Sequence, residues 1–265
     1  MEYSIPDVKN GTTRDAVVTE YTMDKSGYML FPFKGISPRM MKAPITATLY
    51  GTYQGVEYSY TMQYAVTRYC NSLLNTSKDN ELKTLVVDLM NFGTAHQKYA
   101  GHDVDNLINA DLTDAQKALA STYELELNNI FNGRYTVIEG ATAAFKGVAL
   151  TLQEAVLVRV IIECADTKDA YMRFTLGGKN YDVPSSEWVP YSGGANQYEE
   201  FFNNLRSSQM SAELYACDMR GDAVISNTMR YSIESYAAQN INSAKLKDLL
   251  TAMMYYGKSA AAYFS

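Results

Sequence analysis

Few residues of this sequence have the types and spacing that metal binding needs. His96 and His102 are its two histidines, and Asp103 and Asp105 follow the second of them. This pattern could in principle hold a divalent ion, but neither an HExxH motif nor a tight carboxylate cluster accompanies it. We therefore expect a solvated helix end at this place, and no metal or other cofactor.

The short motifs of common enzyme classes are also missing. The sequence has no GxSxG elbow, no phosphate-cradling glycine loop and no dinucleotide fingerprint. Sequence spacing does not reveal which Asp and Glu side chains converge in space, so a pair of catalytic carboxylates stays open. The balance favours a non-catalytic binding module over an enzyme.

The strongest candidate for ligand binding is the loop of residues 184–198, which is rich in Pro, Ser and Gly. Such residues keep a segment at the surface, yet this loop contains Trp188, the single tryptophan. Sugars stack on aromatic rings while amides and carboxylates bond their hydroxyls. The predicted ligand-binding residues are Trp188, Tyr191, Tyr198, Glu187, Asn196 and Gln197. The alternative is that Trp188 plugs the edge of a sandwich.

Composition and charge exclude some classes of partner. The 265 residues are 47% hydrophobic and 20% charged, as in a folded globular protein. A net charge of −6 with scattered Lys and Arg argues against nucleic acid and anionic membranes. No apolar run is long enough to cross a membrane. The 22 tyrosines suit half-buried strands and surfaces that recognise polar ligands. Three well-separated cysteines predict buried, reduced thiols.

An internal repeat determines the expected architecture. Thr61–Val66 recurs as Thr228–Ile233, and Met90–Gly93 recurs as Met254–Gly257. Self-similarity of this kind reflects repeated structural units. The repeated residues share no acid, base, nucleophile or metal ligand, so the repeat indicates a scaffold.

Hydrophobic periodicity predicts strands, a hairpin and a helix pair in each half. In the first half we expect a strand over 28–34, a hairpin over 44–60, and helices over 61–74, 80–99 and 112–119. In the second half we expect strands over 135–139, 143–150 and 155–163, hairpins over 171–183 and 212–227, and helices over 228–238 and 243–264.

These elements predict an α+β fold. We expect a β-sandwich built from both halves of the duplication, packed beside a cluster of α-helices, because an apolar sheet face needs a covering layer. The helices are two pairs plus one short helix. Residues 1–27 are a polar N-terminal lead-in, 28–132 are the first β/α repeat and 133–265 the second, with both halves forming one compact unit.

Several segments resemble a module common in secreted proteins of anaerobic Gram-positive gut bacteria. They are Phe33–Met40, Ile45–Tyr50, Leu89–Tyr99 and Met254–Phe264, and the likeness covers roughly residues 28–265. Such modules sit in large cell-surface or dockerin-bearing proteins. The architecture is similar to the first domain of an amylosome starch-adherence protein, in which a maltooligosaccharide end binds between sandwich and helices. Its ligand-binding residues have no one-to-one match here.

The resemblance implies a non-catalytic carbohydrate-binding module of a secreted, cell-surface protein. The implied ligand is an α-glucan such as starch or maltooligosaccharide, bound in a cleft between sandwich and helices by a monomeric module of a larger protein. The alternative is a protein–protein or adhesion and spacer module without glycan affinity, which predicts an apolar or tyrosine-rich surface patch. A glycan-cleaving enzyme is the third possibility and would need two facing carboxylates.

Overall fold

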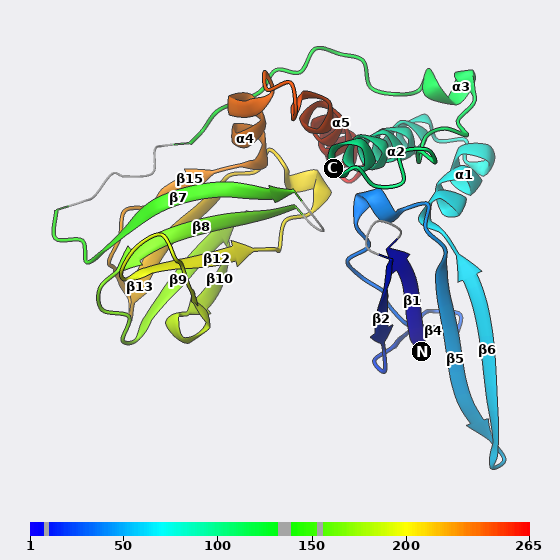
Figure 1. Ribbon diagram of the computed structural model, residues 1–265, viewed down its shortest axis with the longest axis horizontal. Helices are drawn as coiled ribbons and strands as arrows, with labels where there is room; N and C mark the ends of the chain where they lie inside the picture. The colour runs from blue at the N-terminus through cyan, green and yellow to red at the C-terminus, as the bar shows by residue number, and fades with distance from the viewer. Residues whose placement is uncertain (8–10, 132–138, 153–155) are drawn as a thin grey trace. The chain divides into compact units, whose positions relative to one another are not determined.

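The fold combines α-helices with β-sheets in each of two units. The computed structural model describes residues 1–265 apart from 8–10, 132–138 and 153–155 (Figure 1). The described residues divide into one unit at Met1–Thr122 and another at Tyr123–Ser265. The predicted α+β class is confirmed.

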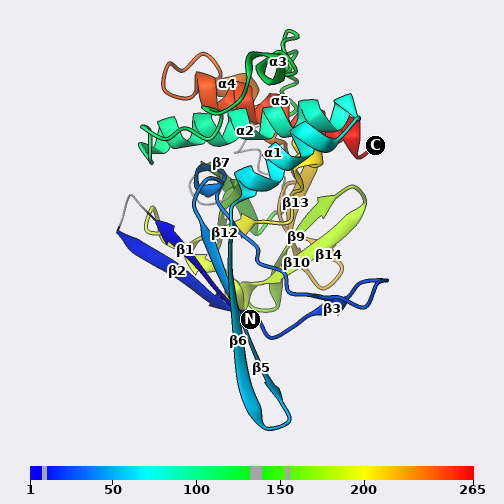
Figure 2. The same ribbon diagram turned by 90° about the vertical axis from the view of Figure 1, so that its right-hand side faces the viewer.

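The main sheet of the first unit is antiparallel, with strand order β2-β1-β5-β6. Its strands are β1 (Glu2–Asp7), β2 (Thr12–Val17), β5 (Ile45–Tyr53) and β6 (Val56–Tyr64). β5 and β6 lie side by side in both ribbon views (Figures 1 and 2) and pair along all their residues. Gln54 and Gly55 join them, and both have positive φ, as a type I′ hairpin turn requires.

Three predictions for the first unit need correction. The helix expected from Thr61 begins at Val66, because residues 61–64 continue the ladder with β5 and alternate sides as a strand does. Of the strand expected over 28–34, only β4 (Met29–Leu30) forms, paired with β3 (Thr22–Met23). The expected polar lead-in contributes β1 and β2 to the main sheet, since Ile5 packs into an apolar cluster.

The helices of the first unit confirm most of the remaining predictions. They are α1 (Val66–Thr76), α2 (Asn80–Ala100) and α3 (Asp114–Lys117), and η1 (Pro38–Met40) is a 3-10 turn. Asp79 caps α2 by accepting hydrogen bonds from two backbone N–H groups, and Gly101 ends it with a φ of 60°. Thr113 caps α3, within the helix expected over 112–119. The core of this unit gathers side chains of α1 and α2 with Met41 and Ile108.

The second unit contains two antiparallel sheets. Their strands are β7 (Ala143–Leu152), β8 (Val156–Cys164), β9 (Ala170–Leu176), β10 (Lys179–Pro184), β11 (Val189–Pro190), β12 (Gln197–Phe202), β13 (Leu214–Arg220), β14 (Ala223–Val224) and β15 (Met229–Tyr231). One sheet has the order β11-β12-β8-β7, and the other has β10-β9-β13-β14 with β15 paired to β13. Phe174 of β9 and Phe202 of β12 join the two sheets, with ring centroids 5.0 Å apart.

The helices of the second unit are α4 (Ile233–Asn240) and α5 (Lys247–Tyr263), and η3 (Ser207–Gln209) is a 3-10 turn. The first of these helices was expected from residue 228, but residues 229–231 pair with β13 instead. The strand predicted over 135–139 falls mostly outside the described residues. Strands of the two halves were expected to pair, whereas each described sheet takes its strands from one unit, largely through short hairpins between sequence neighbours.

The two helix pairs begin and pack in matching ways. Thr67, the second residue of α1, donates its backbone N–H to the carbonyl oxygen of Met41 at 3.0 Å. Glu234, the second residue of α4, does the same to Met210 at 3.0 Å. A Cβ added to Gly93 of α2 would meet Met41 Sδ at 3.2 Å, and one added to the matching Gly257 of α5 would meet Met210 Sδ at 2.6 Å. Each pair therefore places a methionine against the glycine of its second helix.

Candidate interaction surface

The structure buries the tryptophan of the predicted ligand loop. Trp188 is 5% exposed, and its indole N–H donates to the carbonyl oxygen of Val183 at 3.1 Å. Its ring centroid lies 5.7 Å from that of Tyr198. The prediction that Trp188 offers an exposed aromatic platform is therefore wrong. Its apolar ring is buried and its single N–H donor has a hydrogen-bond partner inside the fold. This agrees with the alternative interpretation, in which Trp188 fills the edge of a sandwich.

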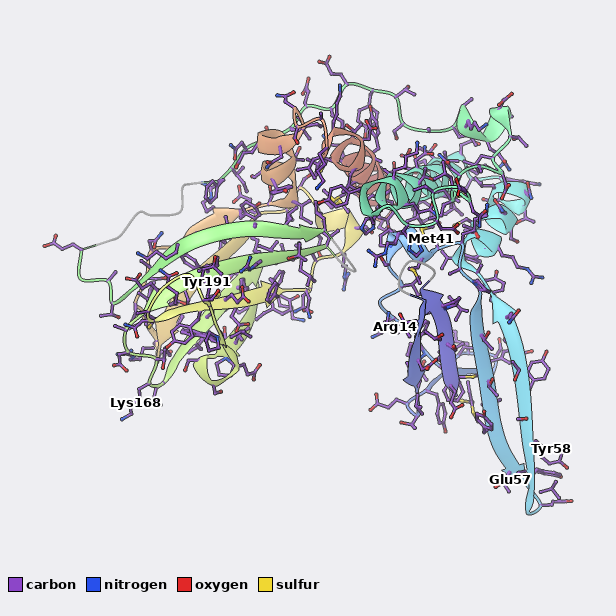
Figure 3. The ribbon with its side chains drawn as sticks, viewed as in Figure 1. Arg14, Met41, Glu57, Tyr58, Lys168 and Tyr191 are labelled. Carbon is purple, nitrogen blue, oxygen red and sulfur yellow. The ribbon has the colours of Figure 1, made fainter. Side chains whose placement is uncertain are left out.

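Two of the other predicted ligand residues, Tyr191 and Gln197, contact side chains of β8. Tyr191 is labelled in Figure 3. The guanidinium carbon of Arg159 lies over its ring, 5.2 Å from the ring centroid. Gln197 donates to Glu163 at 3.4 Å. Glu187 and Asn196 are exposed. The structure thus brings Trp188 and Tyr198 together without opening an aromatic surface there.

Two buried carboxylates of the second unit escaped the sequence analysis. Asp218 of β13 is fully buried, and burial raises its pKa to about 7. Glu200 of β12 is 8% exposed, and burial is likewise the main reason that its pKa rises to about 7. The alternation of apolar residues along each strand would have placed both side chains on an inward face.

The histidines also differ from expectation. His96 is 3% exposed and His102 is 2% exposed, so the expected solvated helix end is wrong. The buried amide of Gln97 accepts from the N–H of Ile108 at 2.9 Å and donates to the carbonyl of Asn106 at 3.2 Å, which folds the following loop back onto α2. Within the described residues, no group of three or more His, Cys, Asp or Glu side chains could hold a metal ion.

An exposed array of aromatic and apolar side chains lies on the β5–β6 hairpin. Residues paired across the two strands share a face, so the register divides the hairpin into an apolar face and a polar face. The exposed part of the apolar face, called the tyrosine face below, consists of Leu49, Tyr53, Val56, Tyr58, Tyr60, Met62 and Tyr64, which are 38% to 69% exposed. Glu57 and Tyr58 lie beside the tip (Figure 3).

The tyrosine face continues a surface that is buried nearer the helices. Ile45 and Ala47 stand on the same face of β5 and are buried. Over neighbouring β1, the ring of Phe33 stacks on Tyr3 with centroids 4.7 Å apart. Because β1 pairs with β5 no further than Thr48, the hairpin extends beyond this cover. The apolar alternation therefore runs from the core into solvent.

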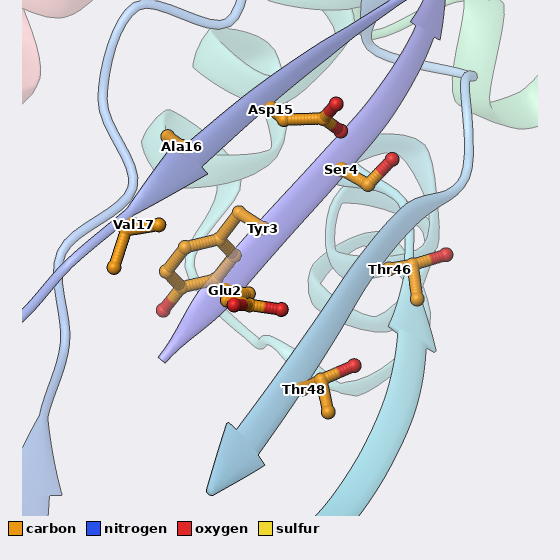
Figure 4. Close-up of a pocket in the computed structure, with 8 residues that line it drawn as sticks. All are labelled: Glu2, Tyr3, Ser4, Asp15, Ala16, Val17, Thr46 and Thr48. Carbon is orange, nitrogen blue, oxygen red and sulfur yellow. The ribbon is translucent and has the colours of Figure 1, made fainter.

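The polar face of the hairpin adjoins a hollow of about 310 Å³ in the same sheet (Figure 4). Its polar lining comes from Glu2, Ser4, Asp15, Thr46 and Thr48. The carboxylate of Glu2 accepts a hydrogen bond from Tyr50 and thereby raises the pKa of that phenol.

Polar residues of the hairpin also bond to one another. The hydroxyl oxygens of Thr48 and Thr61 lie 3.0 Å apart, and Gln63 donates to Thr46 at 3.2 Å. Hydrogen-bonding groups on this hairpin are thus concentrated opposite the tyrosine face.

Comparison with known proteins adds no functional assignment. No protein-family model, curated protein or solved structure matches this sequence. Among the described helices, none is both long and apolar enough to span a membrane. The sequence signal that could have found the tyrosine face is the alternation over Val56–Tyr64, whose second half was interpreted as the start of a helix.

Proposed function

We propose that this chain is a non-catalytic interaction module that contacts another polypeptide through the tyrosine face. The observation that carries the proposal is the row of seven large apolar or aromatic side chains exposed on one face of the hairpin. Contiguous exposed apolar surface on a soluble protein marks an interaction site. Tyr and Met are enriched in protein interfaces, and the seven side chains of this face are uncharged. The guanidinium of Arg68 lies over the ring of Tyr64, at the helix end of the face.

A polypeptide fits this face better than a sugar because of where the polar groups lie. A sugar site needs hydrogen-bonding groups beside the aromatic rings to bond the hydroxyls. The tyrosine face offers only the phenolic hydroxyls of its tyrosines, while Glu57, Ser59 and Gln63 stand on the opposite side. Apolar side chains such as Leu49 and Met62 fill the remaining positions, and they complement apolar groups of a protein partner.

Binding of an α-glucan is the second candidate, and the polar hollow of the same sheet is what favours it. Glu2 and Asp15 supply carboxylates there, and Thr46 and Thr48 supply hydroxyls. These groups match the hydrogen-bonding needs of a sugar. The resemblance to secreted surface modules supports an extracellular, cell-surface setting for either function.

We also infer that the two halves arose by duplication and that the sheets of the second unit form a β-sandwich. The matching contacts of Met41 and Met210 support the duplication, since each accepts the N–H of the second residue of a first helix. Contact between Phe174 and Phe202 across the two sheets supports the sandwich.

Peptide selection tests the polypeptide function. A random peptide library displayed on phage would be selected on the folded protein. We expect most recovered peptides to lose at least about tenfold in affinity for the Tyr58→Ser/Tyr60→Ser variant, because exposed tyrosines dominate such contacts. The matched control Ser59→Ala/Thr61→Ala alters the polar face of the same strand and should bind like the parent. Peptides that bind the tyrosine variant unchanged would contradict the proposal.

Calorimetry with maltoheptaose tests the second candidate. If the glycan function holds, the parent binds and the Glu2→Gln/Asp15→Asn variant loses affinity, while the tyrosine variant retains it. Absence of binding by the parent leaves only the polypeptide function. Binding that is lost in the tyrosine variant would assign the sugar to the tyrosine face and overturn the preference for a polypeptide.

A further inference from the structure

β6 forms an edge of its sheet that no other described strand covers. The strand order β2-β1-β5-β6 leaves its outer side without a partner among the described strands. All nine of its residues are exposed. An edge strand presents a row of backbone N–H and C=O groups that can pair with another chain.

The other sheet edges carry features that oppose such pairing. β2 contains Arg14 and Asp15, and β7 has a bulge at Phe145–Gly147 around Lys146. β10 carries charged residues and ends at Pro184, and β3, β4, β11, β14 and β15 have two or three residues each. Charges, proline, bulges and short length are the usual means of blocking edge pairing.

β6 has none of these features along its central part. Its sequence, VEYSYTMQY, contains no Lys, Arg or Pro, and its pairing with β5 is continuous. The single charge, Glu57, stands next to the turn. By comparison with the protected edges, β6 is the described edge best suited to accept a strand.

We propose that β6 pairs in an antiparallel manner with β6 of a second copy of this chain, with Tyr60 at the two-fold axis. The inference rests on the proposed function only for the premise that this hairpin contacts another polypeptide. It goes beyond that function, because it concerns the edge of β6 and leaves the tyrosine face open. An isologous contact of this kind is the commonest arrangement in homodimers. This register pairs all nine residues of the strand.

Self-complementarity of the sequence in this register is the argument for a second copy. On the apolar side, Tyr60 meets its own counterpart, Tyr58 meets Met62 and Val56 meets Tyr64. Cross-strand aromatic and apolar pairs of this type stabilise a sheet.

The polar side is complementary as well. Glu57 meets Gln63, so the carboxylate faces an amide donor and no like charges oppose each other. The dimer joins the two four-stranded sheets into one. Because the two-fold axis is perpendicular to the sheet, both tyrosine faces lie on the same side and stay open.

Charge variants test the register by sedimentation equilibrium. Within one chain Glu57 pairs with Thr52 and Gln63 with Thr46, so the two positions meet only across the dimer. We expect the parent to dimerise in a concentration-dependent way and Gln63→Glu to weaken the dimer about fivefold, through two like-charge pairs. The double variant Glu57→Lys/Gln63→Glu restores opposite charges and should recover parental dimerisation.

Disulfide crosslinking tests the position of the axis. Residues directly opposite in an antiparallel pair have Cα atoms about 4.5 to 5.5 Å apart, within the range of a disulfide. Under mild oxidation, Tyr60→Cys should therefore give a covalent dimer on a non-reducing gel. Tyr50→Cys, at another exposed tyrosine position on β5, should give no more dimer than the parent with its three native cysteines.

The outcomes separate this inference from the proposed function. A parent that stays monomeric, or a dimer indifferent to the charge variants and not crosslinked through residue 60, would overturn the pairing. If selected peptides still depended on Tyr58 and Tyr60, the proposed function would stand without it. A dimer that follows the charge pattern, with peptides that ignore the tyrosine variant, would support the pairing and overturn the tyrosine face as the binding surface.

Discussion

At the scale of single residues, burial decides what Trp188 does. A ring that is 5% exposed and donates to a backbone carbonyl contributes to stability. We expect Trp188→Ala to lower the free energy of unfolding by about 3 to 5 kcal/mol, through the cavity and the lost hydrogen bond. Chemical denaturation measures this change. The same truncation of half-buried Tyr191 is the control and should cost clearly less, and equal stability of parent and Trp188→Ala would contradict the burial.

Asp218 provides a residue-scale prediction about pH. Burial raises its pKa from an ordinary value of 3.8 to about 7, so the folded state binds a proton that the unfolded state releases at lower pH. The stability contributed by this group is present below pH 4 and is lost as the pH rises through 7.

The neutral variant isolates this effect from the other carboxylates. From pH 4 to pH 8 the parent should lose stability that Asp218→Asn keeps. The free energy of unfolding of the variant, relative to that of the parent, should therefore rise by about 2 to 4 kcal/mol. Denaturant titrations of both proteins at the two pH values measure the difference. A gap between parent and variant that does not change with pH would refute the raised pKa.

At the scale of elements, the two helix-pair glycines have different neighbours. A Cβ on Gly93 would lie 3.0 Å from the backbone carbonyl of Pro38, whereas one on Gly257 would meet the flexible side chain of Met210. We predict that Gly93→Ala costs about 1 to 3 kcal/mol by overpacking, while Gly257→Ala costs less, because Met210 can move and alanine favours the helix.

Denaturation of the two alanine variants checks this contrast. The larger Gly93→Leu change should cost more than Gly93→Ala if the space is as tight as the structure indicates. A Gly93→Leu variant as stable as the parent would show that η1 does not pack closely on α2.

At the scale of the whole molecule, the division into two units makes a prediction about folding. The second unit has its own buried core, in which Met172, Phe174 and Ile162 are fully buried. Residues 123–265 expressed alone should therefore fold cooperatively, with dispersed amide resonances and a single thermal transition. A fragment with the spectrum of an unfolded chain would show that its core needs the first unit.

Local pattern was enough to predict several elements. Three examples depend on contacts close in sequence. They are helix α2, the short capped helix α3 and the hairpin across Gly177-Gly178. Their apolar spacing, caps and turn residues act within a few positions of the chain. The α+β class followed from the same signals.

The tertiary structure decided the rest, because the same local pattern has different outcomes with different distant partners. Residues 61–64 form a strand because Ile45–Thr48 pair with them. Sequence periodicity alone predicted a helix for these residues. Trp188 became buried through contacts with Val183 and Tyr198. Tyr3 is covered by Phe33, whereas Tyr58 and Tyr60 extend past any cover in the described structure. Exposure depends on which segments return over a face, and that is a property of the assembled fold.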